Sequence, residues 1–403
     1  MMDYLTRHAF IRCVALLIAG VLLMLDVGQS KVLASADSYG KRGRMGMKAV
    51  KFDKLAGWHT DDHSAAFKAF QRSCRVILAN RSPAPKKSSI LLKPVCKKAL
   101  SIGANISSQD ARSFFEAHFT AHKVTSPKST GLLTGYYEPV LHGSRTPDKR
   151  FNIPILRRPK DLVNLVGETL RASTGKKLTH ARKSSKGLVP YFTRAEIERG
   201  ALKSQGLELV YLDDPVDAFF LHVQGSGRIK LRDGKMIRIG YDGKNGYRYK
   251  SIGGVLVDSG EVSWDNLTLQ SLRKWLEVDR KRAQQIMWQN RSYIFFREHK
   301  NLKLSGPVGA IDAPLSDGRS LAVDGSYHTL GVPIFVSSPS LRHGGGTRDG
   351  QGLQRLMIAQ DVGSAIKGSV RGDIYFGSGK KAGALAGRTK HRGSFAVLLP
   401  NLK

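Results

Sequence analysis

The chain has few acidic residues and very little cysteine. Its 403 residues include 32 aspartates and glutamates against 65 lysines and arginines, which gives a formal net charge of +33. So large a positive excess favours a polyanionic partner: nucleic acid, an anionic lipid surface or an acidic wall polymer. The basic residues are scattered along the chain and no basic–aromatic nucleic-acid module is readable, so we expect no nucleic-acid partner.

Several catalytic motifs are absent. The phosphate-loop pattern G-x-x-x-x-G-K-[ST] and the nucleophile elbow G-x-S-x-G do not occur. Asp361-Val362-Gly363 lacks the hydroxyl residue of the aspartic-protease triplet and has no second copy. One predicted helix, which starts near Ser107, carries His118 and His122 four positions apart, but no third ligand has recognisable spacing. We therefore expect neither a metal nor a cofactor.

The longest apolar run, residues 14–25, lies at the N-terminus. It follows Arg7 and Arg12, is short for a membrane span, and precedes Ala34-Ser35-Ala36, a small-residue cleavage pattern. These features predict a secretory signal peptide over residues 1–36 and an exported protein; an uncleaved anchor is the alternative.

The three cysteines divide into one in this leader and two beyond it. Cys13 lies before the apolar run, which is the wrong place for a lipid-modified cysteine. Cys74 and Cys96 remain, and an even count in an oxidising compartment permits one disulfide between them. Two buried thiols are the alternative.

Two aspartates flank a glycine-rich loop near the C-terminus. Asp361 follows the apolar run Leu356–Ala359, and Asp373 precedes the β-type run Ile374–Phe376. Burial raises a carboxyl pKa and a neighbouring carboxylate separates two pKa values, so one of the pair can hold a proton near neutrality while the other stays ionised. The alternative is a pair of turn aspartates at strand ends.

The middle of the chain reads as short strands between glycines. We predict strands over residues 219–224 and 236–239, with helices over 268–276 and 280–289. The N- and C-terminal segments flank this module, which suggests an insertion into one discontinuous domain. The loops of this middle module, and the residues just before it, contain polar and aromatic residues suited to binding a polysaccharide in a groove. They are Tyr136, Tyr137, Gln224, Ser226, Asn245 and Tyr247. Core tyrosines and turn polarity are the alternative reading.

Four ordered motifs carry a family resemblance. They are Thr134–Pro139 (TGYYEP), His222–Gly227 (HVQGSG), Tyr247–Gly253 (YRYKSIG) and Gln360–Gly368 (QDVGSAIKG). The chain resembles the membrane-bound lytic murein transglycosylase A (MltA) family, and Asp324, Asp361 and Asp373 resemble the three aspartates of its C-terminal domain.

The resemblance implies a mainly β fold with some α. A double-psi β-barrel domain would form from residues 37–138 with 298–403, and a β-rich domain, residues 139–297, would be inserted, with a groove between them. It implies cleavage of the β-1,4 bond between N-acetylmuramic acid and N-acetylglucosamine in peptidoglycan glycan strands, leaving 1,6-anhydromuramyl ends. Asp373 would be the acid and then the base, with Asp361 in support; the residues alone do not separate these two roles. Gly227 joins the six groove residues as a substrate-binding candidate.

Family members are often outer-membrane lipoproteins, and this leader lacks a lipid-accepting cysteine. We therefore expect a soluble periplasmic monomer, with peripheral association with the outer membrane left open. A non-catalytic peptidoglycan-binding protein is the alternative function, and a nucleic-acid binder is a third.

Overall fold

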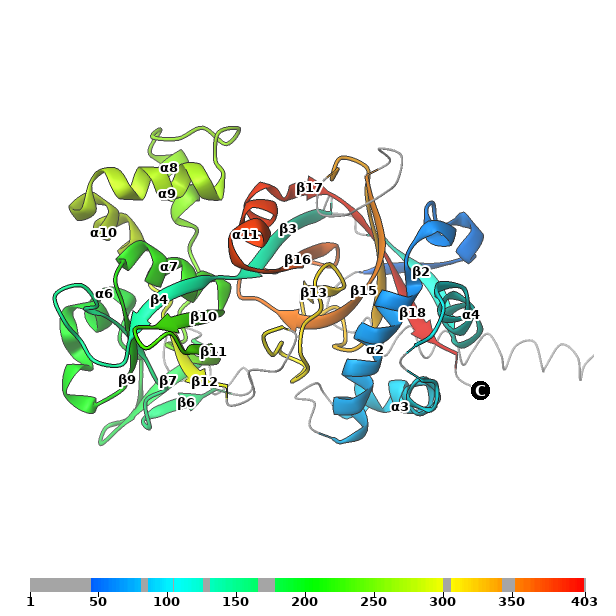
Figure 1. Cartoon of the computed structure of the whole chain (residues 1–403), viewed down its shortest axis with the longest axis horizontal. Helices are drawn as coiled ribbons and strands as arrows, with labels where there is room; N and C mark the ends of the chain where they lie inside the picture. Colours follow the sequence, from blue (N-terminus) through cyan, green and yellow to red (C-terminus); the bar gives the residue numbers. More distant parts are fainter. Residues whose placement is uncertain are drawn as a thin grey trace, which may run out of the picture.

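The computed structural model describes residues 45–80, 86–103, 105–125, 131–165, 178–299, 306–342 and 352–401. The expected signal peptide, residues 1–36, lies outside this part of the chain. Within it the fold is mixed α and β with β-sheets predominant, as the sequence predicts. Figure 1 shows the two larger sheets in separate halves of the molecule, joined where β3 runs on into β4.

One sheet has nine strands and combines strands from both ends of the chain. Its order is β1 (Gly46–Val50), β2 (Phe119–Thr125), β18 (Ser394–Pro400), β14 (Pro333–Ser338), β15 (Leu353–Val362), β13 (Ser320–Val323), β16 (Arg371–Ser378), β3 (Leu132–Glu138) and β17 (Lys390–Arg392). Three helices from the N-terminal segment belong to this half: α2 (His63–Leu78), α3 (Lys86–Ser101) and α4 (Ser108–His118). The last helix, α11 (Gly379–Arg388), lies beside β3 and β16 (Figure 1).

The other two sheets come from the middle of the chain. A six-stranded sheet has the order β12 (Ile294–Glu298), β11 (Met236–Lys244), β10 (Ser226–Leu231), β4 (Val140–Ser144), β9 (Glu208–Leu212) and β5 (Ile153–Leu156). A three-stranded sheet contains β6 (Leu162–Asn164), β7 (His180–Ser184) and β8 (Gly187–Val189). The helices here are α6 (Arg194–Glu196), α7 (Pro215–Gln224), α8 (Ile252–Asp258), α9 (Leu269–Val278) and α10 (Arg280–Gln289). The last two confirm the helices expected over 268–276 and 280–289.

The largest core joins the nine-stranded sheet to α2, α3 and α4. Phe67 and Phe70 on α2 contact Phe114 and Phe115 on α4, with ring centroids 4.9 Å apart for Phe67–Phe114 and 5.9 Å for Phe70–Phe115. All four rings are buried. Each buried phenylalanine stabilises the fold by roughly 1.5–3 kcal/mol, so this aromatic cluster holds α2 firmly beside the sheet.

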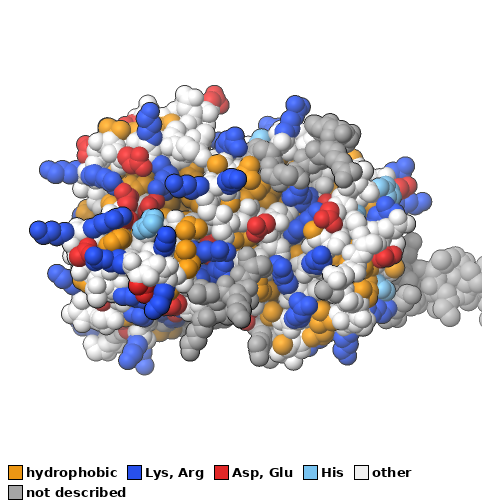
Figure 2. All heavy atoms as spheres, in the orientation of Figure 1, with side chains coloured by type: hydrophobic (Ala, Val, Ile, Leu, Met, Phe, Trp, Pro, Cys, Tyr) orange, Lys and Arg blue, Asp and Glu red, His pale blue; other side chains and the backbone are white. Residues whose placement is uncertain are grey.

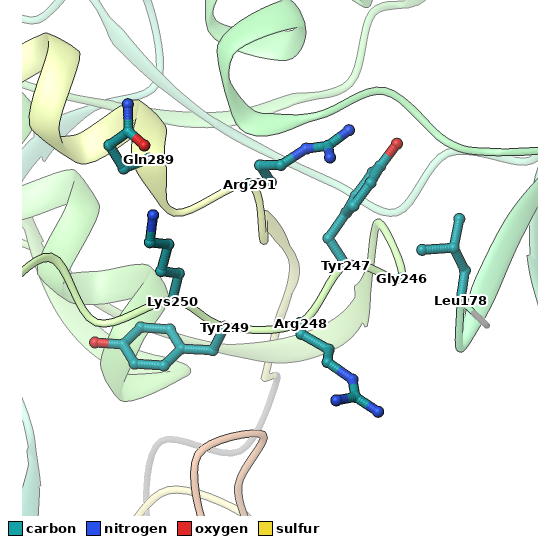
Figure 3. Close-up of a pocket in the computed structure, with 8 residues that line it drawn as sticks. All are labelled: Leu178, Gly246, Tyr247, Arg248, Tyr249, Lys250, Gln289 and Arg291. Carbon is teal, nitrogen blue, oxygen red and sulfur yellow. The ribbon is translucent and has the colours of Figure 1, made fainter. Parts of the chain in front are cut away.

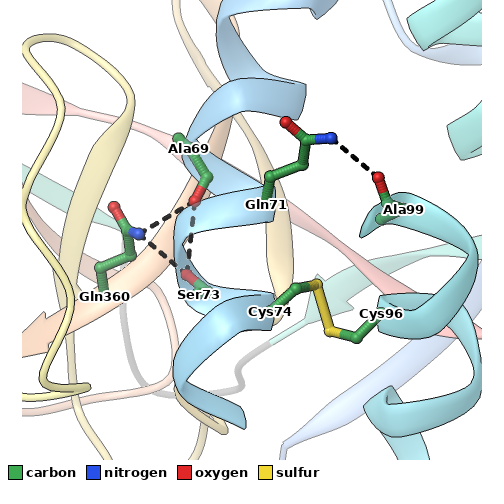
Figure 4. Close-up of a disulfide and its surroundings, with 7 residues drawn as sticks. All are labelled: Ala69, Gln71, Ser73, Cys74, Cys96, Ala99 and Gln360. Atoms are coloured by element: carbon green, nitrogen blue, oxygen red, sulfur yellow. Dashed lines mark hydrogen bonds between the residues drawn. A yellow bond between two sulfur atoms is a disulfide. The ribbon is translucent and has the colours of Figure 1, made fainter. Parts of the chain in front are cut away.

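A disulfide joins Cys74 on α2 to Cys96 on α3, the pairing that the cysteine count predicts. Figure 4 shows it beside Gln360 of β15, whose side-chain amide donates to the Ala69 carbonyl at 3.1 Å and to Ser73 Oγ at 2.8 Å. The helix α2 is therefore tied on one side to α3 and on the other to the strand that carries Asp361.

The strand expected over residues 219–224 is wrong, because this segment belongs to the helix α7. Asp214 caps the helix by accepting from the backbone N–H groups of Val216 at 2.7 Å and Asp217 at 3.1 Å. Pro215 occupies the first turn, and Gly225 ends the helix with a left-handed backbone (φ 78°). The Asp-Pro start and glycine end outweighed the strand preference of the aromatic residues between them.

The expectation that one helix carries His118 and His122 is also wrong. The helix α4 ends at His118, and His122 lies on β2. No group of three or more potential metal ligands gathers anywhere in the described residues. Among the helices in those same ranges, none combines the length and apolar content needed to cross a bilayer.

Candidate active site

The register of four strands sets two aspartates in one transverse row. Ala322 on β13 pairs with Asp361 on β15 and, on its other side, with Asp373 on β16. Thr134 on β3 pairs with Asp373 in turn. Paired residues on neighbouring strands point to the same face, and the strands lie about 4.8 Å apart. Asp361, Ala322, Asp373 and Thr134 are here called the aspartate row. The two Asp Cα atoms therefore lie about 10 Å apart, with only the methyl group of Ala322 between them in the row.

A β-bulge brings Asp361 into this row. Leu321 pairs with Ala359 but the next residue, Ala322, pairs with Asp361, so the strand register skips Gln360, whose side-chain oxygen accepts from Ser320 Oγ of β13 at 2.5 Å. The side chain of Gln360 is buried, and its amide nitrogen donates to α2. A bulge of this kind changes the direction of the side chain that follows it. Here it aims Asp361 at the face that carries Ala322 and Asp373.

Both oxygens of Asp361 are held by hydrogen bonds. The backbone N–H groups of Ala310 and Val362 each donate to Oδ1 at 2.9 Å, and the Tyr136 hydroxyl donates to Oδ2 at 3.0 Å. Burial raises the pKa of Asp361 to about 6, the three donors oppose this rise, and the charge of Asp373 adds to it. Asp361 is therefore largely ionised at neutral pH and fixed in place.

Asp373 is held at one oxygen only. Thr134 Oγ1 donates to Asp373 Oδ1 at 2.5 Å, and Arg371 Nη2 donates to Thr134 Oγ1 at 2.8 Å. Because a guanidinium cannot accept, the hydroxyl hydrogen of Thr134 is directed at Asp373. Burial raises the pKa of Asp373, while the Arg371 charge and the Thr134 hydrogen bond hold it down.

The two carboxyl groups therefore differ in what they can do. Asp373 Oδ2 has no hydrogen-bond partner among the described residues, and the side chain is partly exposed. Asp361 has both oxygens engaged by donors that favour its ionised form. The free oxygen makes Asp373 the better proton donor and acceptor of the pair, a distinction that the sequence left open.

Replacement of Thr134 by valine should move the alkaline limb of the pH–activity profile upward by about one pH unit. The variant loses the hydrogen bond that favours ionised Asp373, so the pKa of Asp373 rises further and the protonated form persists to higher pH. Rates measured between pH 4 and 9 test this expectation. Thr134→Ser keeps the hydroxyl and should keep the wild-type limb; an unchanged limb in Thr134→Val would contradict the role given to this hydroxyl.

The third aspartate, Asp324, lies outside the row and holds a loop. Its Oδ1 accepts from Ser326 N at 3.1 Å and its Oδ2 from Gly368 N at 2.9 Å. Burial works to raise its pKa, but these hydrogen bonds and the Lys367 charge together lower it. Asp324 thus stays ionised and fixes the loop between Asp361 and Asp373.

The sequence-predicted groove residues fall into separate groups. Tyr136 reaches the aspartate row through its bond to Asp361. The backbone N–H of Tyr137 donates to Gln224 Oε1 at 3.0 Å, which joins β3 to the end of α7. Ser226 and Gly227 begin β10, and a Cβ on Gly227 would lie 2.6 Å from Leu221 Cδ1, so close packing requires this glycine.

The structure does not bring Asn245 and Tyr247 to the aspartate row. Asn245 is fully buried and donates to the carbonyls of Phe192 at 2.9 Å and Arg291 at 2.8 Å. The Tyr247 hydroxyl donates to the Tyr191 carbonyl at 3.0 Å. The polar atoms of both side chains therefore bind the protein's own backbone.

Sequence reasoning did not single out Thr134, Arg371 or Lys244. Thr134 could have been found, because it lies two positions before Tyr136 and shares its face of β3. Lys244 lies at the end of β11, and its Nζ donates to Ser364 Oγ at 3.0 Å. This contact joins the six-stranded sheet to the loop that follows Asp361.

A buried carboxylate also lies at the junction of the two sheets. Glu138 ends β3 and is fully buried. It accepts from Arg238 Nε at 2.7 Å, Arg228 Nε at 2.8 Å and Ser378 Oγ at 2.7 Å. The two arginines come from β11 and β10 and the serine from β16, so one side chain joins both sheets.

Two family models match the sequence. The MltA specific insert domain matches residues 132–297, and the 3D domain matches residues 319–399. The first match contains the middle module, and the second contains all three aspartates of the C-terminal segment.

Known proteins with this arrangement are similar over most of the chain. The membrane-bound lytic murein transglycosylase A of Escherichia coli K12 is 36% identical over 268 residues, which are 66% of this chain and 64% of that relative's length. The crystal structure of the membrane-bound lytic murein transglycosylase from Agrobacterium tumefaciens is 36% identical, with a TM-score of 0.80 over 88% of this chain and 98% of that one. The structure of E. coli MltA with bound chitohexaose is 29% identical, with a TM-score of 0.63 over 89% of this chain and 95% of that one. With this fold and identity, the chain belongs to the MltA family.

Proposed function

We propose that the protein is a lytic transglycosylase that cleaves the β-1,4 bond between N-acetylmuramic acid and N-acetylglucosamine in peptidoglycan. The observation that carries this proposal is the aspartate row, in which one carboxyl group is held ionised and its neighbour keeps a free oxygen and a raised pKa. Membership of the MltA family and the glycan bound to E. coli MltA support the choice of substrate.

Asp373 is the acid and then the base in this mechanism. In its protonated form it gives a proton to the glycosidic oxygen as that oxygen leaves C1 of the muramic acid. The sugar passes through an oxocarbenium-like state, and the ionised Asp361 nearby stabilises its positive charge. Asp373 then accepts the proton of the C6 hydroxyl as O6 closes on C1. The proton count balances, no water is consumed, and the muramic acid becomes a 1,6-anhydro sugar.

The fold supports a division into two domains with a groove for the glycan between them. Residues 37–138 and 298–403 would form a double-psi β-barrel that carries the aspartate row, and residues 139–297 would form the inserted, substrate-binding domain. The mixture of N- and C-terminal strands in the nine-stranded sheet supports this division. We place the protein in the periplasm, where its substrate lies.

Product analysis of digested murein tests the proposal. Purified sacculi incubated with the protein should release soluble fragments that carry anhydromuramic ends, as read by mass spectrometry. Reducing muramic ends would identify a hydrolase. Binding to sacculi without any soluble product would identify a non-catalytic wall-binding protein.

A further inference from the structure

A pocket separate from the aspartate row lies in the middle module. Its volume is about 450 Å³, and it is lined mainly by the segment from Gly246 to Lys250 together with residues near the end of α10. Figure 3 shows Lys250 pointing toward Gln289 and Arg291 lying along the ring of Tyr247. A volume of this size suits a small ligand or a short peptide.

Three cations line this pocket with no acidic partner among the described residues: Arg248, Lys250 and Arg291. Their side chains are exposed, unlike those of the buried arginines that hold Glu138. The Arg291 guanidinium lies 4.4 Å from the centroid of the Tyr247 ring, which keeps this charge in one position. A group of cations that has no acidic partner, with one of its charges held in place, attracts carboxylates.

The chain links this pocket to the loop that follows Asp361 through Lys244. Gly246 follows Lys244 by two residues, and Lys244 Nζ contacts Ser364, three residues after Asp361. A group attached to the muramic acid whose bond is being cleaved could therefore extend from the aspartate row toward these cations.

We propose that this pocket binds the carboxylates of the acidic stem peptide carried by the muramic acid; this inference rests on the proposed function. The stem peptide is short and bears several carboxylates, which matches both the volume and the charge of the pocket. The half-buried ring of Tyr249, which also lines the pocket, would contact its apolar parts.

Two measurements on the full-length protein test this proposal. The first compares kcat/KM on sacculi that carry stem peptides with kcat/KM on the same glycan after an amidase has removed them. The second is a calorimetric titration with the free tripeptide L-Ala-D-Glu-diaminopimelate and with its fully amidated form. Both are repeated on the double variant Arg248→Gln with Lys250→Gln.

The matched control is the double variant Lys149→Gln with Lys230→Gln. This variant also removes two positive charges from exposed residues. Lys230 pairs with Met236 at one end of the β10–β11 hairpin, and Lys244 lies at the other end. Lys244 lies eight positions after Met236 along β11, a span of about 26 Å.

We expect the ratio of kcat/KM on stem-bearing to stem-free glycan to fall at least tenfold in the Arg248, Lys250 variant and to stay unchanged in the control. The free tripeptide should bind the wild type, and its affinity for the Arg248, Lys250 variant should be at least tenfold lower. The amidated tripeptide should bind weakly to both proteins. The proposal would be overturned by equal kcat/KM ratios in all three proteins. It would also be overturned if the wild type bound the amidated tripeptide as tightly as the free tripeptide. If the wild type cleaves neither glycan, the proposed function fails, and the titration alone decides whether the pocket binds the peptide.

Discussion

Asp373→Asn should lower kcat on murein by about 10³- to 10⁴-fold while leaving the fold and the binding of glycan intact. Asparagine has the same shape, and its carbonyl oxygen can still accept from Thr134 Oγ1. It cannot give up or take a proton at the glycosidic oxygen, and general acid–base catalysis contributes about 10²–10⁴ to the rate. The loss should lie toward the upper end of this range because one group serves both steps. Release of soluble fragments under substrate saturation measures kcat, and a sacculus pull-down measures binding.

Asp361→Asn is the informative comparison for this variant. It leaves the proton-carrying group in place, so the loss should be smaller, about 10- to 100-fold. Removal of the neighbouring negative charge makes Asp373 easier to ionise, so the alkaline limb of the pH–activity profile should move to lower pH. This direction is opposite to that expected for Thr134→Val. Equal losses in the two variants with no shift of the limb would contradict the separate roles given to the two aspartates.

Glu138→Gln should lower the free energy of unfolding by about 3–5 kcal/mol. The substitution removes the charge that pairs with the buried Arg238 and the partly buried Arg228, and an unpaired buried charge is costly. Arg238 Nη1 also donates to the carbonyl of Gly306 at 3.0 Å, where the chain returns to the nine-stranded sheet, so both passes of the chain between the sheets depend on this cluster. Urea unfolding followed by circular dichroism measures the change.

Glu277→Gln on α9 is the control for that experiment, since it removes an exposed glutamate that forms no ion pair among the described residues. Its free energy of unfolding should stay within about 0.5 kcal/mol of the wild type. A similarly small effect of Glu138→Gln would show that the cluster contributes little to joining the two sheets.

The sequence singled out Asp361 and Asp373 as a candidate pair but could not show how the fold brings them together. Asp361 and Asp373 were recognisable because each adjoins an apolar strand and glycine separates them. Their meeting across Ala322 depends on the bulge at Gln360, which arises from pairing with β13 some forty residues away and from bonds to α2. No local pattern contains this information.

Contacts over long sequence separations account for the other differences. Glu138 meets Arg228 and Arg238 at separations of 90 and 100 residues, so its role could not be seen in the TGYYEP motif itself. Asn245 occurs in a glycine-bounded loop and looked accessible, but its amide is used up by backbone groups of two other segments. The misassigned strand at 219–224 had a local signal, since Asp214-Pro215 and Gly225 are typical helix ends.

Digestion of murein in water enriched in oxygen-18 tests the central claim most directly. Because O6 of the muramic acid attacks its own C1, the account predicts that the new ends contain no oxygen-18 and are lighter by one water than reducing ends. Incorporation of one oxygen-18 at each new muramic end would show that water is the nucleophile, and would contradict the account of Asp373 as a base acting on the C6 hydroxyl.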